Sequence, residues 1–334
     1  VRRGHLLELT GNYEAALDQL QEALDLLPSG YTGSERAAAL DRMGSIYWRS
    51  SQYQRALAVL QEALDLEIAA GRRGRLARYL GNLGLVTKDM GAYEQALDYL
   101  QRALATAEAQ GHREDTARFS LNVGLVYWQT GRVDEAQEYY QRALSLARAL
   151  NHKRGIATCL GNMGVLARLG GRYAEALGYY QEGLALARDL GEKALEAMLL
   201  GNTGNVYMDM GQFKPAVDAL QQAVAMDREL GNLDGVARHL GNLGDLHKYA
   251  GKNVDAAGYF DEALHLLRQS GNKYYLCWVL VAGAEVGLER ALGAADRVNL
   301  LAEVAAMNDE GGKLATEIGR REYAFASRVL AGRV

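Results

Sequence analysis

Residues 81–111 read GNLGLVTKDMGAYEQALDYLQRALATAEAQG, and this stretch decides the fold because the chain repeats it. Close copies are GNMGVLARLGGRYAEALGYYQEGLALARDLG at residues 161–191 and GNTGNVYMDMGQFKPAVDALQQAVAMDRELG at residues 201–231. The period is forty residues, and seven units follow one another from residue 1 to residue 280 without a gap. Fixed periods of this size are typical of stacked supersecondary units. The sequence therefore predicts a repeat architecture for most of the chain.

Small residues recur at three positions of the forty-residue unit. The first column contains Gly44, Gly84, Gly124, Gly164, Gly204 and Gly244; the turn column contains Gly11, Gly91, Gly131, Gly171, Gly211 and Gly251; and the alanine column contains Ala16, Ala56, Ala96, Ala136, Ala176, Ala216 and Ala256. Glycine adopts the left-handed conformation that ends many helices, so the turn column predicts helix ends. The other two columns predict points at which paired helices approach closely. We interpret all three columns as structural.

Two helices in each unit are predicted by apolar residues that recur at i, i+3, i+4 and i+7 on both sides of the turn glycine. In the third unit, the first helix is expected over residues 75–90 and the second over residues 93–109. Neither helix can bury its apolar face alone, so helix pairs must stack, and such a stack curves and presents a concave wall. The predicted fold class is all-α, an α-solenoid of antiparallel helix pairs.

The predicted unit boundaries fall at every fortieth residue. The units are 1–40, 41–80, 81–120, 121–160, 161–200, 201–240 and 241–280. The register decays after these units, and residues 281–334 are predicted to form a degenerate repeat and a capping helix. LATEIGRREYAFASRVLAGRV at residues 314–334 predicts one amphipathic helix. The chain starts with valine and with a unit that lacks its leading turn, so we expect it to be a piece of a larger protein.

Small and large residues alternate with a recognisable spacing inside each unit. In residues 121–160 the positions are Val123, Gly124, Tyr127, Ala136, Tyr140 and Ala143. This spacing resembles the tetratricopeptide repeat, and the resemblance covers residues 1–280 and implies a right-handed superhelix. The tripeptides Leu80-Gly81-Asn82, Leu160-Gly161-Asn162, Leu200-Gly201-Asn202 and Leu240-Gly241-Asn242 are similar to those of Pins-type polarity adaptors and of bacterial sensor regions built from such repeats.

Composition and charge exclude several classes of function. The formal net charge is −4, and the lysines and arginines are scattered through every repeat, so no nucleic-acid partner is expected. No apolar run is long enough to span a membrane, and no signal peptide opens the chain. We therefore expect a cytoplasmic protein with no membrane partner.

Cysteines, histidines and acidic residues do not form a recognisable chemical site in the sequence. Cys159 and Cys277 lie far apart without metal-ligand spacing, which is typical of reduced core thiols. His239 and His247 are eight residues apart on one predicted helix, whereas a helical zinc pair needs a separation of four. No catalytic arrangement of Ser, His, Asp or paired carboxylates stands out. We expect no enzyme activity, no metal and no cofactor.

One column is polar in the middle of a predicted helix. Its members are Asn82, Asn122, Asn162, Asn202 and Asn242. Asparagine costs about 0.5 kcal/mol relative to alanine in a helix interior, so local propensity does not explain the column. A carboxamide has donors and an acceptor that match the C=O and N–H groups of any peptide backbone. Packed helices lie about 10 Å apart, so the column predicts a ladder that meets an extended peptide at roughly every third residue.

Further side chains are expected on the same helix face as the asparagines. Arg78, Arg118 and Arg238 lie four residues before an asparagine, Asn205 lies three residues after one, and Lys88, Trp128, Arg168 and Lys248 lie six residues after one. The Arg-x-x-x-Asn pairs at 78/82, 118/122 and 238/242 are similar to those with which Pins-type grooves hold acidic peptide segments. Arginine binds carboxylates bidentately, which would add side-chain selection to backbone capture. The arginine is replaced by Thr158 and Met198 in the middle units.

The sequence predicts a non-catalytic module that captures an extended, acidic or mixed peptide segment of a partner protein in a concave groove. The alternative for the asparagines is a structural role, in which they bond a neighbouring helix or ordered water. One alternative for the protein is a sensor arm of a larger bacterial signalling ATPase or transcription regulator, with an upstream domain of the same polypeptide as its partner. The other alternative is a scaffold that assembles with copies of itself.

Overall fold

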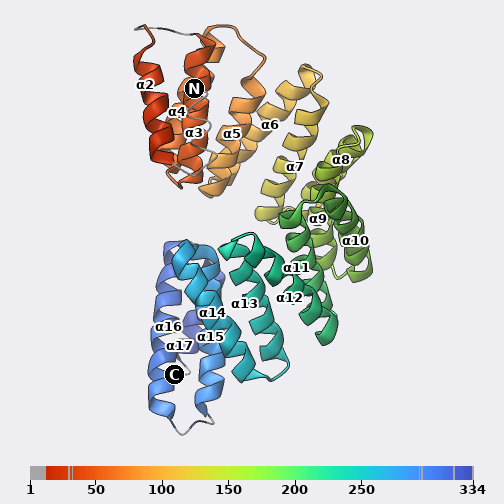
Figure 1. Cartoon of the computed structure of the whole chain (residues 1–334), viewed down its shortest axis with the longest axis vertical. Helices are drawn as coiled ribbons and strands as arrows, with labels where there is room; N and C mark the ends of the chain where they lie inside the picture. Colours follow the sequence, from red (N-terminus) through yellow and green to blue (C-terminus); the bar gives the residue numbers. More distant parts are fainter. Residues whose placement is uncertain are drawn as a thin grey trace. The chain divides into compact units, whose positions relative to one another are not determined.

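A computed structural model describes residues 13–28, 31, 33–292, 294, 296–318 and 320–332. Within these residues all regular structure is α-helical, in sixteen helices labelled α2 to α17 (Figure 1). The chain divides into two compact units, Val1–Cys159 and Leu160–Val334. The division falls inside helix α9, and each unit is described by itself below.

The described residues of the first unit form seven complete helices and the beginning of one more. They are α2 (Tyr13–Asp25), α3 (Ser34–Arg49), α4 (Tyr53–Ala69), α5 (Leu76–Asp89), α6 (Tyr93–Ala109), α7 (Arg113–Gln129), α8 (Val133–Ala149) and α9 (Lys153–Leu169). The pairs α3–α4, α5–α6 and α7–α8 pack most closely, and each pair also packs on the next. The odd-numbered helices α3, α5 and α7 touch one another in turn, so they form one layer of the stack.

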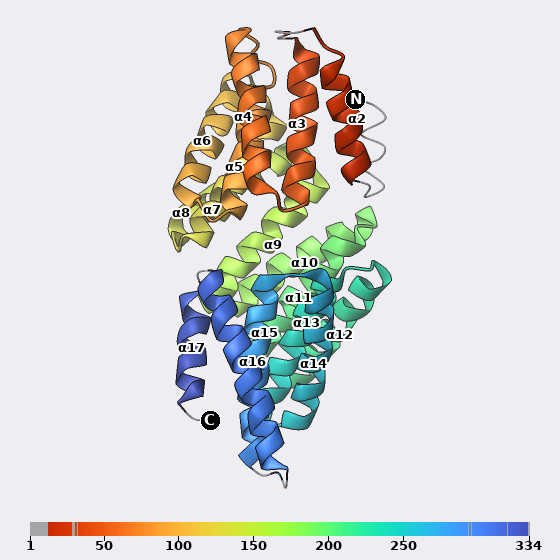
Figure 2. The ribbon, with the colours of Figure 1, turned by 90° about the vertical axis from the view of Figure 1, so that its left-hand side faces the viewer.

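The second unit has the same internal arrangement of helix pairs. Its helices after α9 are α10 (Tyr173–Leu190), α11 (Lys193–Asp209), α12 (Phe213–Glu229), α13 (Leu233–Tyr249), α14 (Asn253–Ser270), α15 (Lys273–Leu292), α16 (Arg297–Glu317) and α17 (Arg321–Ala331). The pairs α11–α12, α13–α14 and α15–α16 pack most closely, and α11, α13 and α15 form one layer (Figure 2). The predicted all-α solenoid of antiparallel helix pairs is confirmed.

Helix ends follow the turn glycines. Helices α5 and α6 begin and end within one residue of the predicted 75–90 and 93–109. Gly91 between them has a φ of 78°, in the left-handed region that costs glycine little and other residues more. Gly11 of the same column lies outside the described residues. The left-handed turn after α8 is made by Asn151, with a φ of 52°.

The first glycine column lies where the two helices of a pair cross. A methyl group placed on Gly84 would lie 2.6 Å from Cγ of Leu100, and one on Gly244 would lie 2.6 Å from Cε1 of Phe260. Leu100 and Phe260 are buried, and each lies four residues after an alanine of the alanine column. The predicted close approach is therefore present. The space left by each glycine is taken by a large apolar side chain of the second helix of the pair, Leu100 or Phe260.

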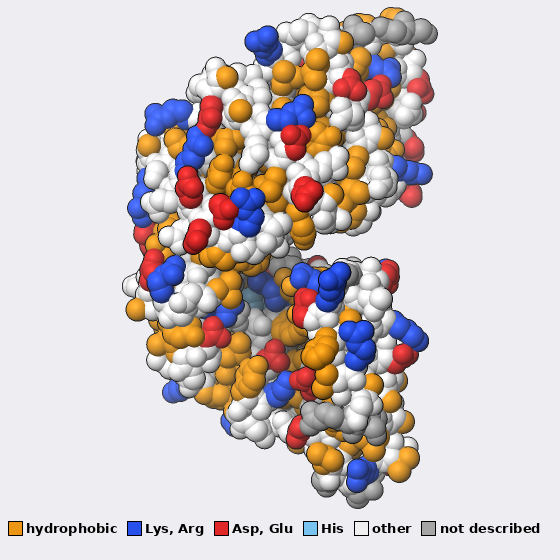
Figure 3. Space-filling model, turned by 180° about the vertical axis from the view of Figure 1, so that it is seen from behind, with side chains coloured by type: hydrophobic (Ala, Val, Ile, Leu, Met, Phe, Trp, Pro, Cys, Tyr) orange, Lys and Arg blue, Asp and Glu red, His pale blue; other side chains and the backbone are white. Residues whose placement is uncertain are grey.

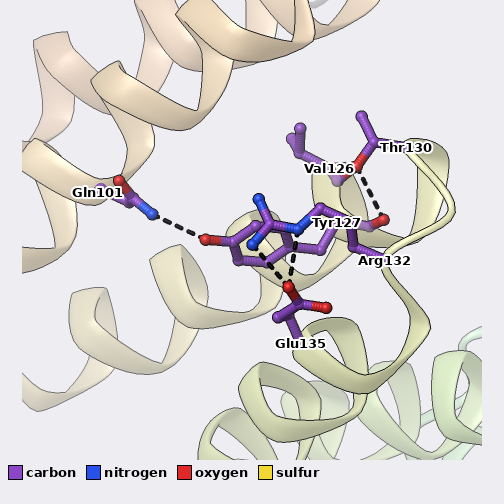
Figure 4. A network of polar contacts seen from close by, with 6 residues as sticks. All are labelled: Gln101, Val126, Tyr127, Thr130, Arg132 and Glu135. Atoms are coloured by element: carbon purple, nitrogen blue, oxygen red, sulfur yellow. Dashed lines mark hydrogen bonds and ion pairs between the residues drawn. The ribbon is translucent and has the colours of Figure 1, made fainter.

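Tyr127 shows how one helix pair is fastened to the preceding one (Figure 4). Its hydroxyl accepts a hydrogen bond of 2.9 Å from Nε2 of Gln101 on α6. Arg132, which is paired with Glu135 at 2.6 Å, places its guanidinium 4.4 Å from the centroid of the tyrosine ring. The tyrosine of the repeat pattern therefore fills the core and also links α7 to α6.

The prediction of a single helix over residues 314–334 is wrong. Helix α16 ends at Glu317 and α17 begins at Arg321. Asn308 of α16 donates to the carbonyl of Ser327 on α17, and the Ser327 hydroxyl donates to the carbonyl of Asn308, both at 2.9 Å. The break lets α17 fold back and bury Leu330 against α16 and the helices beneath it. A continuous helix would leave that apolar face in solvent.

Two further predictions concern membrane-spanning segments and the two cysteines. Among the residues that the structure describes, no helix combines the length and the apolar character needed to cross a membrane. Cys159 and Cys277 are both free and buried, as predicted. The space-filling view shows acidic and basic side chains mixed over the visible face (Figure 3).

Candidate peptide-binding wall

The asparagine column lies in the middle of the odd-numbered helices. Asn82 and Asn122 are on α5 and α7 of the first unit, and Asn162, Asn202 and Asn242 are on α9, α11 and α13 of the second. All five side chains are half-buried. In the described part of the chain, only Asn82 forms a side-chain hydrogen bond. The other four carboxamides have donors and acceptors that no described residue uses.

Asn82 and Arg78 together hold an internal carboxylate. Nδ2 of Asn82 donates to Oδ1 of Asp41 at 2.8 Å, and the Arg78 guanidinium lies 3.0 Å from Oδ2 of the same residue. Asp41 is buried on α3, with 7 % of its surface exposed. Burial raises the pKa of Asp41, although Arg78 and the hydrogen bond from Asn82 act to lower it. The Arg-x-x-x-Asn pair of this repeat is therefore a carboxylate clamp that is already occupied.

The same pair occurs twice more without that internal carboxylate. One and four periods after Asp41 the chain has Gly81 and Gly201, which carry no side chain. Arg118 instead pairs with Asp115 at 2.6 Å on its own helix and lies 4.4 Å from the ring centroid of Phe119. Arg118 is largely exposed, and Asn122 beside it is half-buried. This pair presents a cation and an amide donor toward solvent.

Arg238 and Asn242 form the corresponding pair in the second unit. A guanidinium nitrogen of Arg238 lies 3.3 Å from Nε2 of the buried His239. His239 also lies 3.3 Å from Oδ2 of Asp227, and burial lowers the pKa of this imidazole. The Asp227 carboxylate is further held by Nδ2 of Asn232 at 2.9 Å. Sequence analysis missed this buried cluster, although Asp227 replaces an alanine found at the same position of three other units.

Glycines of the Leu-Gly-Asn tripeptides make room for the following helix. A methyl group on Gly201 would lie 1.9 Å from the His239 ring, and one on Gly81 would lie 2.2 Å from the Phe119 ring. Gly161 is looser, because its nearest neighbour would be Leu199 at 3.1 Å. The glycine is therefore needed for packing between repeats. The sequence feature that could have revealed this packing is the large residue 38 positions after each of these glycines, which is Phe119, Leu199 or His239.

The lysines and arginine six residues after the asparagines are already paired. Arg168 binds Asp209 of the next odd-numbered helix at 2.7 Å, and Lys88 lies 2.7 Å from Asp89. Lys248 pairs with Glu285 on α15. Two of these cations therefore brace adjacent repeats, and a ligand would have to compete with an existing partner for each of them.

Three more polar groups lie near these columns. Trp128 is half-buried on α7, and Asn205 is half-buried on α11 with its Oδ1 atom unbonded to any described residue. Asp245 lies three residues after Asn242, and burial raises its pKa to about 6 while Lys248 acts to lower it. In the described part of the chain, no group of three or more His, Cys, Asp or Glu side chains is arranged to hold a metal ion.

Comparisons with known proteins agree with this architecture. The tetratricopeptide repeat family model matches residues 35–109, 115–189 and 191–269. No match was found among curated proteins.

Three solved structures illustrate the likeness of the fold. The apo form of RapI is 15 % identical, with a TM-score of 0.69 over 80 % of this chain and 96 % of that one. The Rap conjugation gene regulator of plasmid pLS20, in complex with the Phr* peptide, is 20 % identical, with a TM-score of 0.61 over 80 % and 72 % of the two chains. The apo quorum sensor NprR from B. thuringiensis is 18 % identical, with a TM-score of 0.58 over 98 % and 95 %.

Proposed function

This chain belongs to the tetratricopeptide repeat family, and on that premise we propose that it is a non-catalytic module that binds an extended segment of a partner protein. Within a unit, the segment would lie along the odd-numbered helices and be held through the asparagines of that unit, which are Asn82 and Asn122 in the first and Asn162, Asn202 and Asn242 in the second. Carboxamides recognise the backbone of the segment whatever its side chains are, because their donors and acceptor match peptide groups. The complex of the Rap regulator with the Phr* peptide supports this proposal, since it joins a peptide to a similar fold.

The observation that carries the proposal is the occupied clamp at Asp41. Arg78 and Asn82 hold one carboxylate through both of its oxygens, at 3.0 and 2.8 Å. Arg118 with Asn122, and Arg238 with Asn242, have the same spacing, but glycines stand at the positions equivalent to Asp41. Charge-assisted hydrogen bonds to carboxylates are about twice as strong as neutral ones. We infer that the two open pairs each take an acidic side chain or a terminal carboxylate of the bound segment.

The cations at 88, 168 and 248 have a weaker claim to ligand contact. Each already neutralises a carboxylate of the chain itself, so binding a second one would require an exchange. These three pairs are partly buried, so a ligand carboxylate would displace an existing partner at a higher cost than at Arg118. The Arg118–Asp115 pair is more exposed, and such a pair is worth only about 0 to 1 kcal/mol, so a ligand carboxylate can replace Asp115 there. In the proposed complex these residues act mainly as braces between repeats, and the asparagines and the two open arginines supply most of the affinity.

The proposal can be tested with a displayed library of random twelve-residue peptides. The chain should enrich peptides that carry Asp or Glu, and an Asn122→Ala/Asn162→Ala double variant should bind them at least about tenfold more weakly, which is the loss of roughly 1.4 kcal/mol. Equal affinity of the double variant, with an unchanged circular dichroism spectrum, would remove the asparagines from the mechanism. Added salt should weaken binding through Arg118 more than binding through Asn122, because screening acts on charges.

A sensor arm of a larger regulator is the second candidate. It is suggested by the likeness to NprR, which is described as a quorum sensor, but at 18 % identity that likeness extends to the fold alone. The full-length gene separates the two candidates. A nucleotide-binding or DNA-binding domain in the same polypeptide would favour the sensor, and a gene that encodes only repeats would favour the adaptor.

A further inference from the structure

A cavity of about 290 Å³ lies within the first unit, between the beginning of α7, the end of α8 and the beginning of α9. Its walls include Leu121, Ala147, Gly155 and Cys159. Arg118, four residues before Asn122, also lines it. The cavity therefore shares Arg118 with the proposed peptide-binding wall.

The cavity exists because one layer of the repeat is built from small residues. Asp227 and His239, which touch in the second unit, mark two positions that face each other between an even-numbered helix and the next odd-numbered one. The equivalent pairs along the chain are Glu67 with Tyr79, Ala107 with Phe119, Ala147 with Cys159, Ala187 with Leu199, and Leu267 with Val279, all of them buried. Alanine with cysteine is the smallest of these pairs.

Gly155 lines the same gap, and the His152 ring lies over it, 2.6 Å from where a methyl group on this glycine would be. The unit before has Asp115 at this position, and the unit after has Leu195. Leu121, which replaces the glycine of the Leu-Gly-Asn tripeptide, lines the cavity but does not fill it. The cavity is partly open to solvent, and its volume exceeds that of the small voids found in close-packed protein interiors.

Chemically, the cavity has an apolar interior and a rim of mixed charge. Ala143, Ala147, Leu150 and Leu121 line it together with the Cys159 thiol. Burial raises the pKa of that thiol to about 12, so it stays protonated at neutral pH and acts as a small, polarisable apolar group. Glu114, Asp115, Arg118, His152 and Arg154 form the charged rim. Such a rim suits a peptide backbone that stays in water while one side chain enters.

We propose that this cavity is an anchor pocket for an aromatic side chain of the bound segment. This inference rests on the proposed function, because the segment has to lie along α7 to reach the pocket. A cavity of about 150 Å³ lined by apolar side chains is sufficient to bind benzene, so this volume accepts a phenyl or indole ring. Sulfur makes favourable contacts with aromatic rings, and Cys159 supplies that sulfur inside the pocket. A segment whose carboxylate is held by Arg118 and Asn122 places its neighbouring residues at the rim.

The pocket can be tested without knowing the partner. The probe is N-acetyl-4-fluorophenylalanine amide, and its ¹⁹F line width is measured with the protein and with variants. Cys159→Phe fills the pocket with a side chain that the preceding repeat carries at the same position, Phe119, and Ala147→Leu fills it from the opposite wall. Lys214→Ala, at an exposed position of α12 in the second unit, is the control. Circular dichroism establishes that each variant is folded.

The probe signal should broaden with the wild type and with Lys214→Ala. The affinity of the probe should fall about tenfold or more with either filled variant, because the aromatic ring no longer leaves water. Equal broadening with a folded Cys159→Phe or Ala147→Leu protein would overturn the pocket. If one filled variant fails to fold, the other gives the result.

Selection from the twelve-residue peptide library separates this inference from the proposed function. Peptides enriched by the wild type should carry Phe, Tyr or Trp close to an acidic residue, and those enriched by Cys159→Phe should keep the acidic residue and lose the aromatic preference. An unchanged aromatic preference with Cys159→Phe would overturn the pocket and leave the proposed function standing. Enrichment that is independent of Asn122 and Asn162 would remove the ladder, and the fluorine measurement would then decide the pocket on its own.

Discussion

Helices α5 and α7 contain the same pair of side chains in different situations. Arg78 and Asn82 are closed over Asp41, which is buried on the preceding odd-numbered helix. Arg118 and Asn122 have Gly81 at the equivalent place, and the ring of Phe119 fills the space above that glycine. One repeat uses the pair to fasten itself to its neighbour, and the other leaves the pair open to solvent.

This difference shows that a column of a repeat has no single role. The residue that decides between a structural and an open pair is not in the pair but 41 residues before its asparagine, where aspartate or glycine stands. A glycine at this position also makes room for a large side chain of the next odd-numbered helix, such as Phe119 on Gly81. The open pairs are therefore a consequence of how the repeats are packed, and the following predictions test that link.

The largest effect is expected when the glycine of an open pair is changed. Gly201→Ala should destabilise the protein by about 3 kcal/mol, because the new methyl group would lie 1.9 Å from the ring of the buried His239. Gly161→Ala meets only the end of Leu199 at 3.1 Å and gains helix propensity of about 1 kcal/mol, so it should be nearly neutral. Thermal and urea unfolding followed by circular dichroism measure both. Equal losses for the two variants would contradict the packing role given to Gly201.

A smaller difference is expected between two arginines. Arg78→Ala should destabilise the protein by about 2 kcal/mol, because the buried Asp41 carboxylate loses its charged partner and stays out of water. Arg118→Ala should cost less than about 0.5 kcal/mol, since Asp115 lies on a hydrated helix surface. Urea unfolding of both variants gives the comparison. A loss from Arg118→Ala as large as that from Arg78→Ala would show that the two pairs are equivalent.

The smallest effect concerns pH and the pair in the second unit. Asp245, three residues after Asn242, has its pKa raised to about 6 by burial, whereas an unfolded aspartate titrates near pH 4. Below about pH 4 the Asp245 side chain is protonated in both states, and its contribution to stability is fully present. As the pH rises from about 4 through about 6, the unfolded state loses the proton before the folded state does, so that contribution is lost.

Asp245→Asn removes that ionisation. Its melting temperature should exceed that of the wild type at pH 8, by the equivalent of about 1 kcal/mol, and the excess should shrink toward zero at pH 4. Lys248 keeps its ion pair with Glu285 in this variant, so the change reports mainly on Asp245. If the melting temperature of Asp245→Asn exceeded that of the wild type by more at low pH than at high pH, a raised pKa of Asp245 would be contradicted.

Local patterns in the sequence predicted most of the fold. The bounds of α5 and α6 and the left-handed turn at Gly91 follow from helix periodicity and glycine chemistry, which act within a few residues. The break between α16 and α17 was missed, because residues 314–334 are amphipathic throughout. It is the Asn308–Ser327 contact between two helices that decides where the chain turns back.

The candidate site was only partly predictable for a physical reason. Which asparagines and cations share a helix face follows from helix geometry, but whether each has a partner depends on the neighbouring repeat. Asn82 is hydrogen-bonded to Asp41, and Arg168 forms an ion pair with Asp209. In both cases the partner lies 41 residues away in the sequence. The cavity beside Cys159 depends on the summed sizes of side chains from three helices, and no pattern within one unit reports that sum.

The central claim is that open Arg-x-x-x-Asn pairs bind a partner and the occupied pair does not. Its most direct test measures the affinity of one acidic peptide enriched by library selection for the wild type, for Arg118→Ala/Asn122→Ala, and for Asn82→Ala. We predict that the double variant binds at least about tenfold more weakly, whereas Asn82→Ala stays within about twofold of the wild type, because its carboxamide is already bonded to Asp41. Unchanged affinity of the double variant, or an equal loss with Asn82→Ala, would contradict the account.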